Sequence, residues 1–132
     1  MFSKLITALA LAWAALAARA TDLVVIVNPS APPLTQEQVA DVFLGRAPRS
    51  TPIDLPSDSP VRAEFYSRAT GRDMAQVKAV WSRVIFTGKG LAPKEYADAA
   101  AVKRAVAANP RAVGYIEKSA VDSSVKVAFQ VE

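Results

Sequence analysis

The sequence predicts an α/β domain built on a mixed sheet, because hydrophobic strand patterns alternate with amphipathic helix patterns along residues 21–132. The first strand pattern, Leu23 to Val27, is apolar and β-branched without polar alternation, which is typical of a strand buried on both faces. Each helix pattern that follows starts at a capping residue and stops at glycine or at Asn109-Pro110. No internal repeat or low-complexity linker interrupts them, so one domain with one core is expected.

The first twenty residues have the pattern of a signal peptide. Lys4 gives a positive start, Leu5 to Leu16 is an apolar run, and Ala18-Arg19-Ala20 is a small-x-small cleavage site. The run of twelve is shorter than the roughly 20 residues that a transmembrane helix needs. We therefore expect cleavage after Ala20, a mature domain that covers residues 21–132, and a periplasmic location.

Composition excludes several kinds of site. With no cysteine and no histidine, the chain has no disulfide, no thiolate metal site and no Ser-His-Asp or Cys-His catalytic group. We expect no enzyme activity, no cofactor and no metal, and a hydrolase that uses a serine-lysine or carboxylate pair is a distant alternative. Residues 21–132 carry 14 basic and 12 acidic side chains without a basic run, which argues against nucleic acid as a partner.

Local signals mark the elements that follow the first strand. Thr35 and Gln38 fit a capping box for a helix that ends at Gly45. Ser50 to Leu55 is the second strand, and Pro52 places it at a sheet edge or at the start of a strand.

Two further helices follow that strand. Ser59 and Pro60 predict a helix start, and Thr70-Gly71-Arg72 predicts its end. Asp73 begins the next helix, whose apolar stripe is expected in the core and consists of Met74, Val77, Val80, Trp81 and Val84.

The last third of the domain reads as loop, helix and two strands. Thr87 to Gly90 is a loop, Asp98 to Ala108 an alanine-rich helix, and Val113 to Ile116 a strand. The final strand, Val125 to Val131, alternates apolar and polar residues, so one face should bury Val125, Val127, Phe129 and Val131. Trp81 and Tyr115 are expected as core or rim aromatics.

Two loops carry the candidate ligand-binding residues. Ser57 and Ser59 stand at the start of a helix whose free N–H groups and dipole favour an anion, and Arg62 adds a permanent cation one turn inside. Asn28 and Ser30 follow the first strand, at the kind of sheet edge where open α/β sheets hold ligands. The alternative is that Ser59 is only a cap, Arg62 a surface side chain and the Asn28 loop an ordinary turn.

Five motifs occur in a recognisable order along the chain: Asn28, Phe43-Leu44-Gly45, Ser57 to Ser59, Gly88-Lys89-Gly90 and Pro110 to Glu117. In this order they resemble one lobe of the periplasmic phosphate-binding proteins that serve ABC transporters. The resemblance implies one lobe of a type II periplasmic-binding-protein-like fold and an oxyanion ligand. In this alignment Leu55 stands where the family has an arginine, and Ser57 stands where it has an aspartate. Ser59 is the one residue that clearly matches the family's serine turn.

The resulting expectation is an exported solute-binding-type protein that binds phosphate or a similar oxyanion for an ABC phosphate uptake system or for sensing. Its partners would be an ABC transporter membrane complex or a sensor protein, and a second copy in a homodimer would cover the open site. The alternative is a periplasmic interaction or scaffold module on the same fold that no longer binds ligand.

Overall fold

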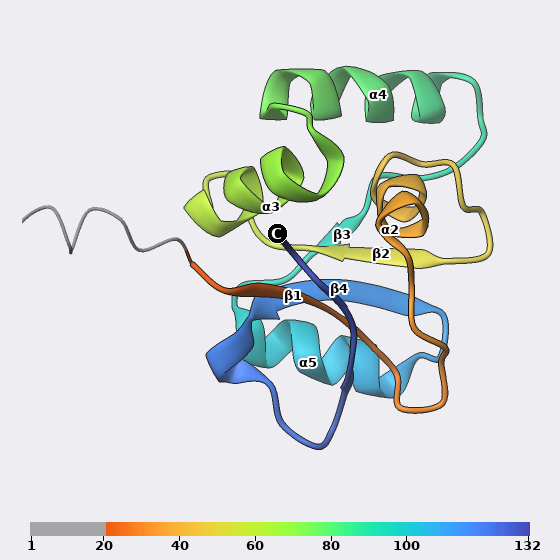
Figure 1. The fold of residues 1–132 in the computed structure, drawn as a ribbon. Coiled ribbons are helices and arrows are strands. Elements are labelled where there is room, and N and C mark those ends of the chain that lie inside the picture. The colour runs from red at the N-terminus through yellow and green to blue at the C-terminus, as the bar shows by residue number, and fades with distance from the viewer. Residues whose placement is uncertain (1–20) are drawn as a thin grey trace, which may run out of the picture.

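The computed structural model describes residues 21–132, and the predicted signal peptide lies outside this range. It contains a mixed sheet with helices on both faces (Figure 1). The strands are β1 (Leu23–Val27), β2 (Thr51–Asp54), β3 (Lys94–Glu95), β4 (Ala112–Glu117) and β5 (Lys126–Gln130). The helices are α2 (Gln36–Phe43), α3 (Pro60–Thr70), α4 (Met74–Phe86), α5 (Ala99–Ala108) and the short 3-10 helix η1 (Lys118–Ala120).

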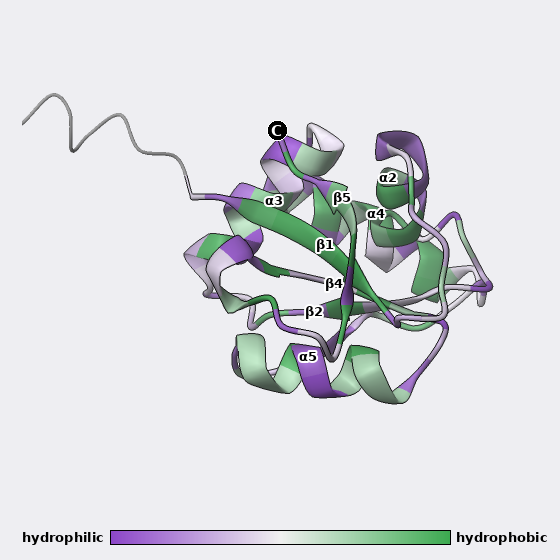
Figure 2. Cartoon of the chain, turned by 60° about the horizontal axis from the view of Figure 1, so that its bottom comes forward, coloured by the Kyte–Doolittle hydropathy of each residue, from purple (hydrophilic) through white to green (hydrophobic). Residues whose placement is uncertain are grey.

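The strand order in the sheet is β3-β2-β4-β1-β5. β1 runs antiparallel to both of its neighbours, β4 and β5, whereas β2 is parallel to β3 and β4. The predicted α/β class with a mixed sheet is therefore confirmed. Helix α5 covers one face, and α2 and α3 cover the other, with α4 further out (Figures 1 and 2).

The core is centred on β1. All of its residues are buried, and Figure 2 shows it hydrophobic along its length, as expected for a strand covered on both faces. Within residues 21–132 the core residues form one cluster that runs from Leu23 to Val131. Within this range no helix is long and apolar enough to cross a bilayer.

The predicted helix starts are confirmed by their caps. Thr35 and Asp73 each form a capping box, and the Ser59 hydroxyl accepts a hydrogen bond from the N–H of Arg62. Gly71 ends α3 in the left-handed conformation, with φ of 70°.

Helix α4 is less buried than its stripe predicts. Only Val77 and Trp81 are buried, and Met74, Val80 and Val84 are partly buried against the core. Helix α4 makes most of its helix contacts with α3. The Trp81 indole anchors the helix by donating a hydrogen bond from Nε1 to the carbonyl of Phe43 at 2.9 Å.

The predicted alternation of the last strand is wrong at Val127 and Ala128, and Phe129 is only partly buried. Val127 is exposed and Ala128 is buried, because a bulge opposite Val25 and Ile26 shifts the pairing of β5 by one residue. An extra residue on one strand moves the following side chains to the opposite face.

Of the two alternatives for Pro52, the sheet edge is wrong, whereas the start of a strand is close, because Pro52 is the second residue of β2. β2 lies inside the sheet, between β3 and β4. β3 pairs only with Ile53 and Asp54, so Pro52 has no strand partner on that side and its missing N–H costs no ladder bond there.

A single side chain joins the two ends of the described chain. Arg68 in α3 donates from Nη1 to the carbonyl of Thr21 at 2.6 Å, and from Nη2 and Nε to the carbonyls of Val131 and Glu132 at 3.2 and 3.3 Å. Glu64, one turn earlier, accepts from the same guanidinium at 3.1 Å. Both ends are therefore fastened to α3.

Helix α5 approaches β4 at Gly114, where a side chain would not fit. A Cβ there would lie 2.8 Å from Val102 Cγ1 and 3.2 Å from Val106 Cγ2. Gly114→Ala is expected to lower the free energy of unfolding by about 1–3 kcal/mol through overpacking, measured by urea unfolding. The control is Gly90→Ala, whose Cβ would meet Val84 Cγ1 at an ordinary 3.4 Å. Equal stability of the two variants would contradict this packing.

Candidate functional site

The site is built around Asp54, the last residue of β2 and the only acidic or basic residue among residues 21–132 that is buried, at 1% exposure. Its carboxylate accepts hydrogen bonds from the hydroxyls of Tyr66 in α3, at 2.7 Å, and Tyr115 in β4. The backbone N–H of Leu55 adds a third donor at 3.1 Å. One carboxylate thus ties together the end of β2, α3 and β4.

Aromatic packing holds these two tyrosines in place. The ring of Phe65 stacks on Tyr115 with centroids 3.9 Å apart, and Phe43 meets Phe65, Tyr66 and Tyr115 edge-on. Burial, and then the neighbouring Asp54 carboxylate, raise the pKa of both tyrosines well above the ordinary value. Both hydroxyls therefore stay protonated and act as donors to Asp54 at neutral pH.

Burial also raises the pKa of Asp54. The hydrogen bonds from Tyr115 and Tyr66, the charge of Arg62 and the Leu55 N–H lower it in part, but the loss of hydration outweighs them.

Arg62 connects this buried carboxylate to the surface. Its Nε lies 3.5 Å from Asp54 Oδ1, and Nη1 donates to the carbonyl of Leu55 at 3.0 Å and to Glu95 Oε2 at 3.2 Å. The guanidinium carbon lies 6.0 Å from the ring centroid of Tyr66. Among the buried side-chain nitrogen and oxygen atoms of residues 21–132, only Arg62 Nε lacks a hydrogen-bond partner. The attraction between Nε and the Asp54 carboxylate is therefore by charge alone.

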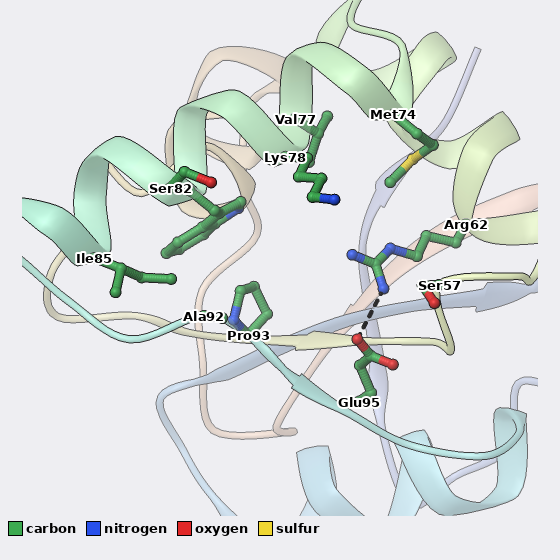
Figure 3. A pocket seen from close by; sticks show the side chains of 11 residues that line it. Ser57, Arg62, Met74, Val77, Lys78, Ser82, Ile85, Ala92, Pro93 and Glu95 are labelled. Carbon is green, nitrogen blue, oxygen red and sulfur yellow. Dashed lines mark hydrogen bonds and ion pairs between the residues drawn. The ribbon is translucent and has the colours of Figure 1, made fainter.

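Beside Arg62 lies a pocket of about 430 Å³ between α4 and the ends of β2 and β3 (Figure 3). The part of the pocket with Ser57 and Glu95 lies at the carboxyl ends of the parallel strands β2 and β3, where open α/β sheets bind ligands, whereas Ala92 and Pro93 precede β3. Its polar residues are Ser57, Arg62, Lys78, Ser82 and Glu95. Its apolar residues are Met74, Val77, Trp81, Ile85, Ala92 and Pro93.

The charged groups of the pocket face one another. In Figure 3 the Lys78 ammonium and the Arg62 guanidinium point into the same space from α4 and α3, and Glu95 reaches Arg62 from β3. The pocket therefore combines two cations, one carboxylate and the exposed Ser57 hydroxyl. Such a set can hold a small anion if Glu95 moves away from Arg62.

The structure brings together two of the five predicted ligand residues. Ser57 and Arg62 line the pocket, whereas Ser59 turns its hydroxyl to the N–H of Arg62 as a helix cap. Pro60 has no N–H, so few backbone donors remain at the start of α3 for an anion.

Asn28 and Ser30 lie at the opposite end of the strands. Val27 pairs with Val113 near the start of β4, because β1 is antiparallel to β4, whereas Asp54 ends β2 at the other edge. Asn28 Nδ2 donates to the carbonyl of Ala107 at 3.0 Å, and its Oδ1 accepts from the hydroxyl of Ser30 at 2.7 Å. These internal hydrogen bonds are those of a turn, and Asn28 and Ser30 lie away from the pocket.

The Gly88-Lys89-Gly90 loop does not join the pocket either. Lys89 and Gly90 line a separate hollow of about 310 Å³ next to Trp81, together with Thr51 and Lys94. Within residues 21–132 no group of three or more Asp, Glu, His or Cys side chains could hold a metal ion.

Several site residues escaped the sequence analysis. Asp54 stands between Ile53 and Leu55 in an otherwise apolar strand, and an acid in that place is a usable signal for a buried polar network. Tyr115 was expected only as a core or rim aromatic, and Tyr66 was not singled out. Lys78 and Glu95 enter the pocket only through the packing of α4 and β3.

No family model matches the chain, and no curated protein matches it in sequence. Solved structures share its fold. A crystal structure of an ABC-type phosphate transport receptor from Vibrio cholerae has a TM-score of 0.64 and 22% identity, covering 81% of this chain and 45% of the receptor. A putative phosphate ABC transporter substrate-binding protein from Clostridium perfringens, solved with bound phosphate, has a TM-score of 0.61 and 19% identity. That match covers 82% of this chain and 44% of the other.

The chain thus spans less than half the length of either solved protein. This confirms the predicted fold, a single lobe like that of a periplasmic phosphate-binding protein.

The raised pKa of Asp54 makes stability depend on pH. Because the folded state holds this proton more tightly than the unfolded state, the contribution is fully present below the unfolded pKa of about 4 and is lost as pH rises through the folded pKa. The free energy of unfolding of the native protein should therefore decrease, relative to that of Asp54→Asn, as pH rises above about 4. Urea unfolding over a pH series measures this difference.

The control for this experiment is Asp122→Asn. Asp122 is exposed, and hydrogen bonds from Lys103 and Ser124 lower its pKa, so its effect appears only in acid and has the opposite sign. Identical pH profiles for Asp54→Asn and the native protein would show that the Asp54 pKa is not raised.

Proposed function

We propose that this protein is an exported receptor lobe that binds phosphate or a similar oxyanion weakly in the pocket between α4 and the ends of β2 and β3. The observation that carries the proposal is the convergence of Arg62, Lys78 and Ser57 on one opening at the carboxyl edge of parallel strands. The shared fold with phosphate receptors, one of them solved with phosphate, supports the same ligand class.

The donors suit a tetrahedral oxyanion. Within residues 21–132, Arg62 uses Nη1 for Leu55 and Glu95 and has no hydrogen bond at Nη2, which leaves one nitrogen for an anion. Lys78 supplies a second positive charge, and Ser57 a hydroxyl donor. Charge-assisted hydrogen bonds contribute about 1.5–3 kcal/mol each, and millimolar affinity requires about 4 kcal/mol, so two or three such bonds give weak binding.

Glu95 competes with the anion for Arg62. Its carboxylate lies 3.2 Å from Nη1, on an edge strand where half of its side chain is exposed. Binding then exchanges Glu95 for the ligand oxygen and returns the carboxylate to water. This exchange is a further reason for weak affinity.

The proposal includes export and partners. Cleavage after Ala20 would release the lobe into the periplasm, where it would deliver its anion to an ABC transporter membrane complex or to a sensor protein. The apolar run and small-x-small site support export, and the solved proteins of the same fold support the transporter class. The role proposed is binding without turnover.

An interaction or scaffold module without ligand is the second candidate. The observation that favours it is that the side chains of Asn28, Ser30 and Ser59 form hydrogen bonds within the protein. A phosphate-dependent rise in melting temperature separates the two, because a ligand of the native state must stabilise it.

Substitutions in the pocket should change phosphate affinity in opposite directions. Lys78→Ala is expected to weaken binding about fivefold or more, and Arg62→Ala about tenfold or more, through loss of a charge-assisted bond. Glu95→Gln is expected to strengthen binding by up to about fivefold, because it removes the competing carboxylate. Calorimetry of residues 21–132 measures this, and Trp81, the only tryptophan in that range, reports on the pocket wall by fluorescence.

The matched control is Asp41→Asn. It removes the acidic partner of an arginine elsewhere, since Asp41 pairs with Arg46 at 2.9 Å, and should leave phosphate affinity unchanged. Absence of saturable, phosphate-selective binding up to tens of millimolar, with no rise in melting temperature, would replace the receptor proposal with the interaction module.

Processing can be tested separately. The protein recovered from the periplasmic fraction of a bacterial host should begin at Thr21, as measured by intact mass and N-terminal sequencing. A chain that keeps residues 1–20 in the membrane fraction would contradict cleavage and export in soluble form.

A further inference from the structure

We propose that the end of α4 and the loop after it bind the protein to an anionic bilayer surface. The surface belongs to residues 74–94, which we call the basic segment. The segment also forms one wall of the anion pocket, to which it contributes Lys78 and Ile85, but binding to a bilayer would not require bound phosphate.

Exposed apolar side chains gather in this segment. Phe86 and Leu91 are 91% and 86% exposed, and Ile85 is 45% exposed. Elsewhere in residues 21–132, Val127 is the one large hydrophobic residue with comparable exposure, at 41%. Nearly full exposure of a phenylalanine and a leucine five residues apart marks an interaction surface more than a packing defect.

The same segment is positively charged. It contains Lys78, Arg83, Lys89 and Lys94 and no acidic residue, which gives a charge of +4, whereas residues 21–132 as a whole carry only +2. None of these four cations takes part in the ion pairs found within the described part of the chain. The remainder of residues 21–132 therefore carries a net charge of −2 (+2 minus +4).

The loop has a defined shape that presents the apolar side chains outward. Gly88 has φ of 70°, and the N–H groups of Gly88 and Lys89 donate to the carbonyls of Ile85 and Val84 at 3.0 Å. The helix end is thus closed by its own backbone bonds. Figure 1 shows α4 on the outer side of the molecule, beyond α3.

Charge and shape favour a bilayer over other occupants. A second copy of the chain would bring eight cations together, whereas anionic headgroups neutralise them. Aromatic and leucine side chains flanked by Lys and Arg are the composition of interfacial anchors, which insert side chains to the depth of the headgroups. Two projecting side chains need no complementary hollow, whereas a stable protein interface needs about 800 Å² of matched surface on each side.

The test is flotation of residues 21–132 with phosphatidylcholine vesicles that contain phosphatidylglycerol, compared with phosphatidylcholine alone. We expect binding to the anionic vesicles that weakens with salt. The double substitution Phe86→Ser with Leu91→Ser should reduce the partition coefficient about tenfold or more, and Lys89→Glu about fivefold or more. These side chains are exposed, so the variants should melt like the native protein.

Matched controls lie outside the basic segment. Val127→Ser removes an exposed apolar side chain from β5, and Arg104→Glu reverses an exposed charge on α5, and neither should change the partition coefficient. Failure to bind anionic vesicles overturns the proposal, as does equal binding of the basic-segment variants. Binding to polyglutamate but not to vesicles would assign the surface to an acidic protein, and a dimer broken by Phe86→Ser would assign it to a second copy.

Discussion

The buried carboxylate of Asp54 sets the geometry on which the pocket depends. Burying a carboxylate is costly unless donors surround it, and here two tyrosine hydroxyls, one backbone N–H and the Arg62 charge converge on it. The donors come from α3, β4 and the end of β2, so these three elements cannot shift independently. Arg62 is consequently held at the mouth of the pocket, whatever ligand the pocket takes.

The two walls of the pocket differ in how firmly they are held. The wall formed by β2 and α3 is fixed by the Asp54 network, whereas α4 is fastened chiefly through Val77 and Trp81. A helix with few buried residues opens at lower free energy than the core. Movement of α4 would therefore carry Lys78 toward or away from Arg62, and this is the adjustable part of the site.

Most of the fold was predictable because its signals are local. Caps such as Thr35, Ser59 and Asp73 act within one helical turn, and an apolar strand such as Leu23 to Val27 needs no knowledge of its neighbours. Strand direction and register are long-range properties, so the bulge in β5, the two-residue β3 and the interior place of β2 did not follow from the sequence. The predicted ligand residues lie in two separate places for the same reason. Because β1 runs antiparallel to β4, Asn28 and Ser30 lie at the opposite edge of the sheet from Arg62. Lys78 and Glu95 depended on how α4 and β3 pack.

Because Arg68 binds the carbonyls of Thr21, Val131 and Glu132, both ends of the described chain lie close together on α3. Since Thr21 and Glu132 are held by one guanidinium, their ends emerge together. A short peptide could link them into a ring with little loop-closure entropy, and a circularly permuted chain could open instead at the exposed turn around Gly88. The same proximity lets the whole lobe be inserted into a loop of another protein without stretching either polypeptide.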